Sequence, residues 1–322
     1  MPIYSKTEFG NSFLVLNSFC LYILDNPQQL NVNQGITKIK YVTVEEKSVN
    51  ALIRLLPDNL DTLRNLEYSN LKNGYIEKKL YFANEFHSVS NGEVFLVSFE
   101  SDVEQTKKAI LSLIAIIGNS IMVEANISSF WYRLEVDLDA SIDAGSGIGE
   151  NPLHIDMLTF KNYPKGMVIY CERPDSKNGG ETLLAPLNLY SFLPIAYANV
   201  LMKPSFSYWQ DKNLEQIGDH LNQFSVLPTM DDDRVRFTAK LPKWINNNNQ
   251  EKVHYDRERM LESIYYYDCL LKSNCIRLSL QHGQAVIFSQ LHFAHGRSTL
   301  GSGQVEIPTE LRRLLWRSYF NY

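Results

Sequence analysis

Short apolar segments separated by polar turns recur along the chain from residue 91 onward. Runs of this length, rich in Val, Ile, Phe and Tyr, are typical of buried or half-buried strands. The strands predicted in this way are Gly92–Phe99, Phe130–Leu138, Met167–Cys171, Thr182–Leu184, Ile276–Leu280, Ala285–Ser289 and Leu314–Phe320.

Helical spacing is confined to fewer segments. Val103–Ile117 follows Asp102, a residue type that accepts hydrogen bonds at helix starts, and Gly118 stands just past its end. Leu187–Leu193 resembles a short helix, and Asp256–Leu271 has helical spacing. Strands with sparse helices predict a mainly β fold with flanking helices, whose core is a jelly roll closed on itself, the double-stranded β-helix.

The first ninety residues carry no chemical motif. Phe13–Leu24 is apolar, and periodicity does not decide between a strand and a helix there. Val44–Leu56 is predicted to be a helix, and Asp58–Leu71 a second one. We therefore predict that residues 1–90 form a flanking or cap segment packed on a jelly-roll domain at residues 91–322.

Composition is that of an ordinary soluble globular protein. The 322 residues can bury a sizeable core as one large domain or two smaller ones, with 44% hydrophobic and 21% charged residues. The net charge of −5 argues against a general nucleic-acid binder, which would be basic. The four cysteines have no Cys-x-x-Cys spacing, so neither a disulfide framework nor a zinc site is indicated.

The N-terminal apolar stretch lacks the basic flank of a signal peptide and is too short to span a bilayer. We therefore predict a cytoplasmic protein without a transmembrane segment. Its expected partner is a small-molecule substrate and not a nucleic acid, and an oligomer is left open.

A histidine and a carboxylate stand two residues apart at His154 and Asp156. On an extended segment this spacing sends both side chains to the same side. Two imidazoles and one carboxylate, with the opposite positions open, suit a non-haem Fe(II) centre that activates oxygen. A second histidine from a distant strand would complete such a site, and the rivals are His292 and His295.

Four motifs occur in a fixed order across residues 92–322. They are His154-Ile155-Asp156, Gly179-Gly180-Glu181-Thr182-Leu183, His295-Gly296-Arg297 and Arg312-Arg313-Leu314-Leu315-Trp316-Arg317. In order and separation they resemble the taurine dioxygenase family of Fe(II)/2-oxoglutarate-dependent oxygenases. The resemblance implies that His154, Asp156 and His295 bind iron, with 2-oxoglutarate and oxygen as co-substrates. The His-Gly-Arg match favours His295 over His292, and an insertion around residues 200–275 is expected to cover the active site.

The far carboxylate of 2-oxoglutarate needs a fixed cation, for which a planar guanidinium is well suited. By the resemblance, Arg313 takes this role and Thr182 supplies a hydroxyl that shares the carboxylate. Arg313 and Arg317 share one face of an extended segment, and burying two arginines is costly without anions to meet them. The resemblance assigns Arg317 to an anionic group of the primary substrate, with Arg297 and Arg133 as further candidates. The link that precedes Arg313 is longer than in the family, which leaves open which arginine meets the co-substrate.

The predicted activity is hydroxylation of an unactivated carbon of a small polar substrate, with release of succinate and carbon dioxide. Candidate substrates are an amino acid, a sulfonate, a carnitine-type precursor and an acidic sugar. Asp156 argues against halogenation, for which the family replaces this carboxylate with a small residue. The alternative is a catalytically silent barrel that binds a small acid or acts as an interaction module. The glycine-rich segment Asp139–Glu150 is predicted to be a mobile lid beside the site.

Overall fold

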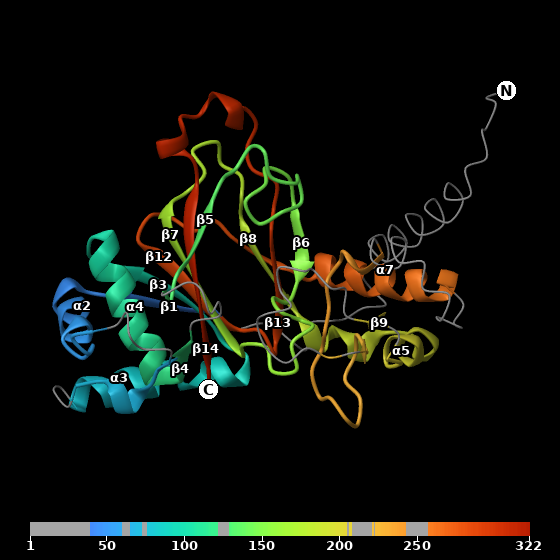
Figure 1. Ribbon diagram of the computed structural model, residues 1–322, viewed down its shortest axis with the longest axis horizontal. Helices are drawn as coiled ribbons and strands as arrows, with labels where there is room; N and C mark the ends of the chain where they lie inside the picture. The colour runs from blue at the N-terminus through green and yellow to red at the C-terminus, as the bar shows by residue number, and fades with distance from the viewer. Residues whose placement is uncertain are drawn as a thin grey trace.

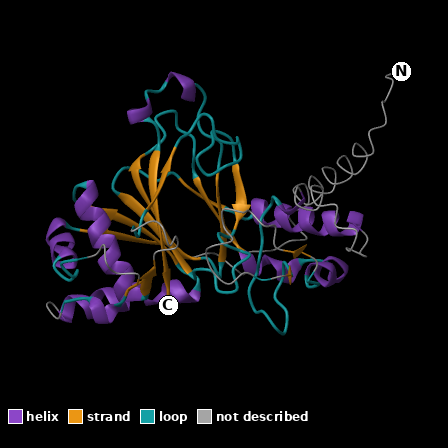
Figure 2. Ribbon diagram, viewed as in Figure 1, coloured by secondary structure: helices purple, strands orange, loops and turns teal. Residues whose placement is uncertain are grey.

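The computed structural model describes residues 39–59, 65–72, 76–121, 129–204, 206–207, 221, 223–242 and 257–322. Within these ranges a large and a small β-sheet lie between two groups of helices (Figures 1 and 2). The fold is therefore mixed α/β, with more helical covering than the predicted mainly β fold. The apolar segment Phe13–Leu24 lies outside the described residues.

The large sheet contains eight strands and runs in the order β1-β3-β12-β7-β14-β4-β2, with β5 paired beside β14. Strand β1 is parallel to β3, whereas β12, β7 and β14 are antiparallel to their neighbours. The strands are β1 (Ile39–Val44), β2 (Asn65–Leu66), β3 (Val94–Phe99), β4 (Asn119–Ile121), β5 (Tyr132–Glu135), β7 (Gly166–Arg173), β12 (Gln284–Ser289) and β14 (Leu314–Asn321).

The small sheet has the order β11-β8-β13-β6 and is antiparallel throughout. Its strands are β6 (Asn151–His154), β8 (Thr182–Pro186), β11 (Ile276–Leu278) and β13 (Phe293–Arg297). One cluster of buried side chains joins residues of both sheets, among them Met167, Leu184 and Phe288. The two sheets therefore face each other across a shared apolar core.

Among the described residues no ladder of hydrogen bonds joins the two sheets, so the predicted closure into a barrel is not found there. The large sheet continues past its central strands on both sides, with β1 and β3 at one edge and β4 and β2 at the other. These outer strands pair with the central strands through backbone hydrogen bonds, and the small sheet remains a separate facing layer.

Helix α4 (Val103–Ile117) packs on the outer face of the large sheet. It begins after Asp102, whose carboxylate accepts a hydrogen bond from the Gln105 amide at 2.9 Å, and ends at Gly118, as predicted. Its buried side chains form one cluster with those of α2 (Glu46–Ile53), α3 (Ile76–Phe86) and strands β3 and β7. This packing leaves the opposite face of the large sheet turned toward the small sheet.

Helices α5 (Ile195–Leu201) and α7 (Arg257–Ser273) cover the small sheet (Figure 1). Helix α7 matches the helical spacing of Asp256–Leu271, and the short helix predicted at Leu187–Leu193 is a 3₁₀ helix at Leu187–Phe192. A separate two-stranded antiparallel sheet consists of β9 (Phe206–Ser207) and β10 (Gln223–Phe224).

Of two helices predicted in the N-terminal residues, one is confirmed with shorter bounds and one is wrong. The helix predicted at Val44–Leu56 is α2, which begins at Glu46 because residues 39–44 form a strand of the large sheet. The described part of Asp58–Leu71 contains β2 and a 3₁₀ turn in place of a helix. Strand pairing overrides the local helical pattern at Val44 and at Asn65–Leu66.

Cys171 and Cys275 are free thiols, whereas Cys269 on α7 is disulfide-bonded, although the cysteine spacing did not indicate a disulfide. No helix in the described ranges is long and apolar enough to cross a bilayer.

Candidate metal centre and adjoining cavity

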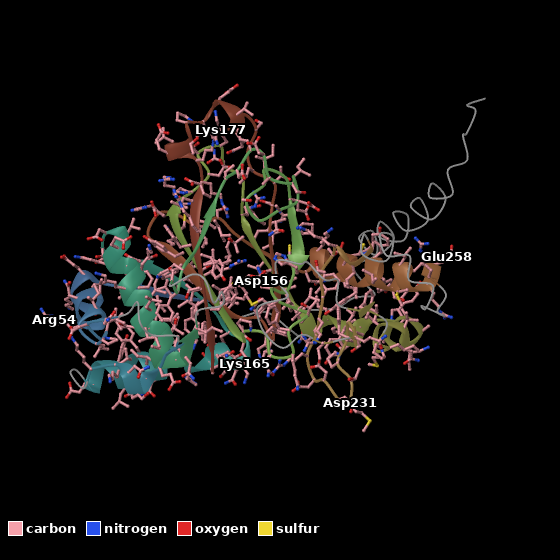
Figure 3. The ribbon with its side chains drawn as sticks, viewed as in Figure 1. Arg54, Asp156, Lys165, Lys177, Asp231 and Glu258 are labelled. Atoms are coloured by element: carbon pink, nitrogen blue, oxygen red, sulfur yellow. The ribbon has the colours of Figure 1, made fainter. Side chains whose placement is uncertain are left out.

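Strand pairing in the small sheet brings together two histidines that are far apart in the sequence. His295 on β13 lies opposite His154 on β6. Opposed residues of antiparallel strands project to the same face, so the two imidazoles are neighbours. Asp156 follows two residues after His154 and lies in the centre of the molecule (Figure 3).

The three side chains converge closely enough to share one ion. Their candidate ligand atoms all lie within 4.8 Å of one another. His154 Nε2 lies 3.3 Å from Asp156 Oδ1, and His295 Nε2 lies 3.5 Å from Asp156 Oδ2. Two imidazole nitrogens and one carboxylate oxygen in this arrangement suit non-haem Fe(II), which binds such a set on one face.

Each of the two histidines can present one ring nitrogen to a metal. His154 Nδ1 lies 2.7 Å from the Pro152 carbonyl oxygen, which can only accept, so Nδ1 carries a proton and Nε2 is the ring nitrogen that faces Asp156. Burial and the neighbouring His154 lower the pKa of His295 to about 4. The His295 ring is therefore neutral near pH 7. Its Nδ1 has no hydrogen-bond partner among the described residues.

Asp156 is held by several neighbours at once. Arg317 Nη1 donates to its Oδ2 at 2.7 Å, and the Tyr319 hydroxyl donates to the same oxygen at 2.6 Å. The Asp156 amide donates to Gln290 Oε1 at 3.0 Å. Burial by itself raises the pKa of Asp156, but Arg317 and the two histidines bring it well below its usual range. The carboxylate is therefore ionised and fixed in direction.

A cavity adjoins His295 between the two sheets. Its charged lining residues are Arg297, Arg313 and Arg317, and no acidic side chain is found among the described residues that line it. A cationic cavity of this kind suits a ligand with carboxylate groups. The described residues that line it are Leu134, Gly145, Asn151, Ile169, Thr182, His295, Gly296, Arg297, Arg313, Leu315 and Arg317.

Arg313 is buried at the edge of this cavity. Its Nη2 donates to the Gly180 carbonyl oxygen at 3.1 Å, and burial together with Arg297 lowers its pKa to about 9. Gly180 has a φ of +67°, and a Cβ there would lie 3.0 Å from Arg313 Nε and 2.6 Å from Leu300 Cδ2. The Gly-Gly-Glu-Thr motif therefore serves the site twice: Gly180 makes room for the guanidinium, and Thr182 lines the same cavity.

Arg297 holds the glycine-rich segment Asp139–Glu150 from inside the molecule. Its Nη2 donates to the carbonyl oxygens of Gly147 and Gly149, both at 2.7 Å, and lies 3.4 Å from that of Ala144. A Cβ on Gly147 would lie 2.1 Å from a backbone oxygen, so this folded-back turn requires glycine. The segment lacks helix and strand, as predicted, and Gly145 reaches the cavity. Its mobility stays a prediction.

Two residues considered from the sequence lie elsewhere. Arg133 pairs with Glu135 at 3.0 Å on β5, where its neighbour Leu134 points into the cavity because side chains alternate along a strand. His292 is exposed and lies 3.0 Å from the Ser90 carbonyl oxygen through Nε2, outside the three-residue group.

Some residues of the site were not predicted. Tyr319 lies two positions after Arg317 on β14. Because alternate residues of a strand project to the same face, the sequence could have predicted that Tyr319 lies beside Arg317 in the site. Gln290 and Thr238 carried no local signal. Thr238 forms an isolated β-bridge with His154, and Gln290 accepts a hydrogen bond from the Asp156 amide. Gln290 and Thr238 are both brought to the site only by the tertiary fold.

Two facing sheets with a His-Asp-His group define the class: the chain has the fold of non-haem iron oxygenases that use 2-oxoglutarate. An asparagine oxygenase in complex with Fe(II), 2S,3S-3-hydroxyasparagine and succinate is similar with a TM-score of 0.63 and 12% identity, over 87% of this chain and 93% of that chain. The oxygenase OrfP in complex with Fe and alpha-ketoglutaric acid is similar with a TM-score of 0.59 and 11% identity, over 88% and 94%. No family model and no curated protein matches the sequence. The likeness confirms, at the level of the fold, the resemblance that the motifs indicated.

Proposed function

We propose that this protein is an Fe(II)- and 2-oxoglutarate-dependent dioxygenase that hydroxylates a small polar substrate, with release of succinate and carbon dioxide. The proposal rests on one observation: the candidate metal ligands lie next to a cavity lined by arginines. His154, neutral His295 and ionised Asp156 converge beside a cavity whose charged lining residues, among those that the structure describes, are arginines. A candidate metal-ligand set and a cationic cavity thus occupy adjoining positions.

In this proposal the imidazole Nε2 atoms and the Asp156 carboxylate hold Fe(II), which supplies the oxygen activation. Arg313 and Thr182 bind the far carboxylate of 2-oxoglutarate, since a buried guanidinium beside a hydroxyl suits a bidentate anion.

The surrounding side chains orient these groups and exclude water. Arg317 and Tyr319 keep the Asp156 carboxylate in one direction through its Oδ2. Leu134, Ile169 and Leu315 supply apolar walls to the cavity, which limits competing water around the charged groups.

We propose an amino acid as the substrate class. The asparagine oxygenase contains 3-hydroxyasparagine, and an OrfP variant contains (3S)-hydroxy-L-Arg. Arg317 is the proposed contact for an anionic group of the substrate, because it lies at the metal ligand Asp156 and also lines the cavity. Sulfonates, carnitine-type precursors and acidic sugars are the competing classes.

The test is a screen for substrate-stimulated formation of succinate. Purified protein receives Fe(II), ascorbate and 2-oxoglutarate, together with single amino acids or members of the competing classes. Succinate and a product heavier by one oxygen atom are measured by mass spectrometry. Asp156→Ala is the control, because it removes the carboxylate ligand and should remove the stimulation.

A parallel measurement examines the alternative of a silent barrel. Under anaerobic conditions an Fe(II)–2-oxoglutarate chelate gives a pale absorption band. If wild-type protein gives no such band and no compound stimulates succinate formation, the proposed function is wrong.

A further inference from the structure

Arg297 has more hydrogen-bonding capacity than its known contacts use. Its Nη2 holds the carbonyl oxygens of the glycine-rich segment, whereas its Nε and Nη1 are buried and have no hydrogen-bond partner among the described residues. The residue is 4% exposed, so water does not compensate for these donors. A buried donor without a partner is costly, which points to a ligand that completes the site.

The strand register directs Arg297 toward the cavity. Arg297 lies opposite Thr182 on β8 and opposite Asn151 on β6, and all three line the cavity. Opposed residues of antiparallel strands share a face, so Arg297 and Thr182 approach a ligand from the same side.

Arg297 and Arg313 are close enough to repel each other. The charge of Arg297 contributes, after burial, to the lowered pKa of Arg313. Asp175 is a carboxylate whose charge acts on both arginines. Its oxygens, however, already accept hydrogen bonds from the amides of Lys177, Gly179 and Gly301 and from the Gln304 side chain. Two repelling buried cations therefore face a cavity in which the described lining residues supply no anion.

We propose that Arg297 is a positioning residue that couples binding of the co-substrate to the glycine-rich segment 139–150. One side of its guanidinium holds the backbone of the segment, and the other side meets the same far carboxylate that Arg313 binds. This inference rests on the proposed function and deepens it. The segment is then most ordered when the dicarboxylate is bound, because the anion fixes the Arg297 guanidinium that donates hydrogen bonds to the backbone of the segment.

The first test compares two ligands on the Mn(II)-loaded protein by calorimetry. 2-Oxoglutarate carries the far carboxylate, and 2-oxopentanoate has a methyl group in its place. Arg297→Gln should weaken binding of 2-oxoglutarate by about ten- to a hundred-fold, the usual effect of losing a charge-assisted hydrogen bond. Binding of 2-oxopentanoate should change by less than about two-fold. Equal losses for both ligands, or no loss for either, would overturn the proposal.

The matched control is Lys240→Met. Lys240 Nζ donates to the Asp143 carbonyl oxygen at 2.6 Å, so it also holds the glycine-rich segment, but it does not line the cavity. This variant should loosen the segment and leave the preference for 2-oxoglutarate over 2-oxopentanoate as in the wild type. If Lys240→Met lowers that preference as much as Arg297→Gln does, fastening of the segment accounts for the effect and Arg297 does not meet the carboxylate.

Hydrogen exchange of the amides in residues 139–150 measures the coupling itself. In the wild type, 2-oxoglutarate should slow this exchange and 2-oxopentanoate should not. Arg297→Gln should abolish the difference. Should Arg297→Gln fail to fold, Arg297→Lys replaces it, because one ammonium cannot reach both the backbone and the carboxylate; an unchanged ligand preference and unchanged exchange response in that variant would overturn the proposal. Wild-type protein that binds neither ligand would instead refute the proposed function.

Discussion

The hydroxyl of Tyr319 provides a sharp test of how the metal ligand Asp156 is held. It donates to Asp156 Oδ2 at 2.6 Å, and the Tyr319 side chain is almost completely buried in the core shared by the two sheets. Tyr319→Phe removes this hydroxyl and keeps the ring, so the packing is preserved. Asp156 Oδ2 then keeps Arg317 as its donor, at 2.7 Å.

The expected magnitude follows from the charge of the acceptor. A hydrogen bond to a charged group contributes about 1.5–3 kcal/mol, which corresponds to roughly ten- to a hundred-fold in a binding constant. Loss of a group that orients a metal ligand has an effect of similar size on metal affinity. Because Arg317 still holds the oxygen, we expect the lower end, about a ten-fold loss of metal affinity.

The assay is competition between the protein and a fluorescent chelator for Mn(II) or Co(II). Tyr322→Phe is the matched control: its hydroxyl lies 2.6 Å from the neutral Ser289 Oγ, away from the three ligands. The control should bind metal as the wild type does, and thermal unfolding confirms that both variants fold. A Tyr319→Phe protein that binds metal within about two-fold of the wild type would refute the idea that this bond orients the carboxylate.

Further predictions concern the co-substrate, the distal ligand, stability and pH. Arg313→Ala should weaken 2-oxoglutarate binding by about ten- to a hundred-fold and Thr182→Val by about five-fold, measured by calorimetry; the reverse order would contradict the assignment. His295→Ala should lose metal and His292→Ala should retain it in the chelator assay, and the opposite result would make His292 the ligand. Asp102→Ala should reduce the free energy of unfolding in urea by about 1 kcal/mol, because α4 loses its N-terminal hydrogen bond, whereas Asp102→Asn should cost less. The pKa of His295 is about 4 in the folded, metal-free protein and near 6.5 when unfolded, so the unfolded state binds more protons between these values. Stability should therefore fall as the pH drops from about 6.5 to 4, by up to about 3 kcal/mol, and urea unfolding of metal-free His295→Gln should show a smaller fall; an equal fall would contradict the shift.

The features that depend on local spacing could be predicted from the sequence. The two-residue period of an extended chain predicted that His154 and Asp156 project together, because that period is a property of the backbone. Helix α4 begins and ends where its capping residues indicated, since Asp102 and the helix start are neighbours in the chain. The motif that contains Arg313 was found for the same reason, because it consists of residues that are adjacent in the sequence.

The tertiary structure decided which distant segments meet. His295 became the partner of His154 because β13 pairs with β6, and no local pattern encodes that pairing. The contact of the Arg317 guanidinium with Asp156 was not predicted, because it joins β14 to the segment that follows β6, which is far away in the sequence. In place of the closed barrel predicted from the strands, the described residues form two layers, and strands from the first 121 residues extend the larger one.

The double position of Arg297 is a further result of the fold alone. Its sequence motif marked it as a candidate for binding an anion, and nothing nearby in the chain indicated that it also holds residues 144–149. Hydrogen bonds to a backbone carbonyl do not depend on the identity of the side chain at that position, so they leave no mark in the sequence on the accepting side. Such contacts become visible only when both segments are placed in space.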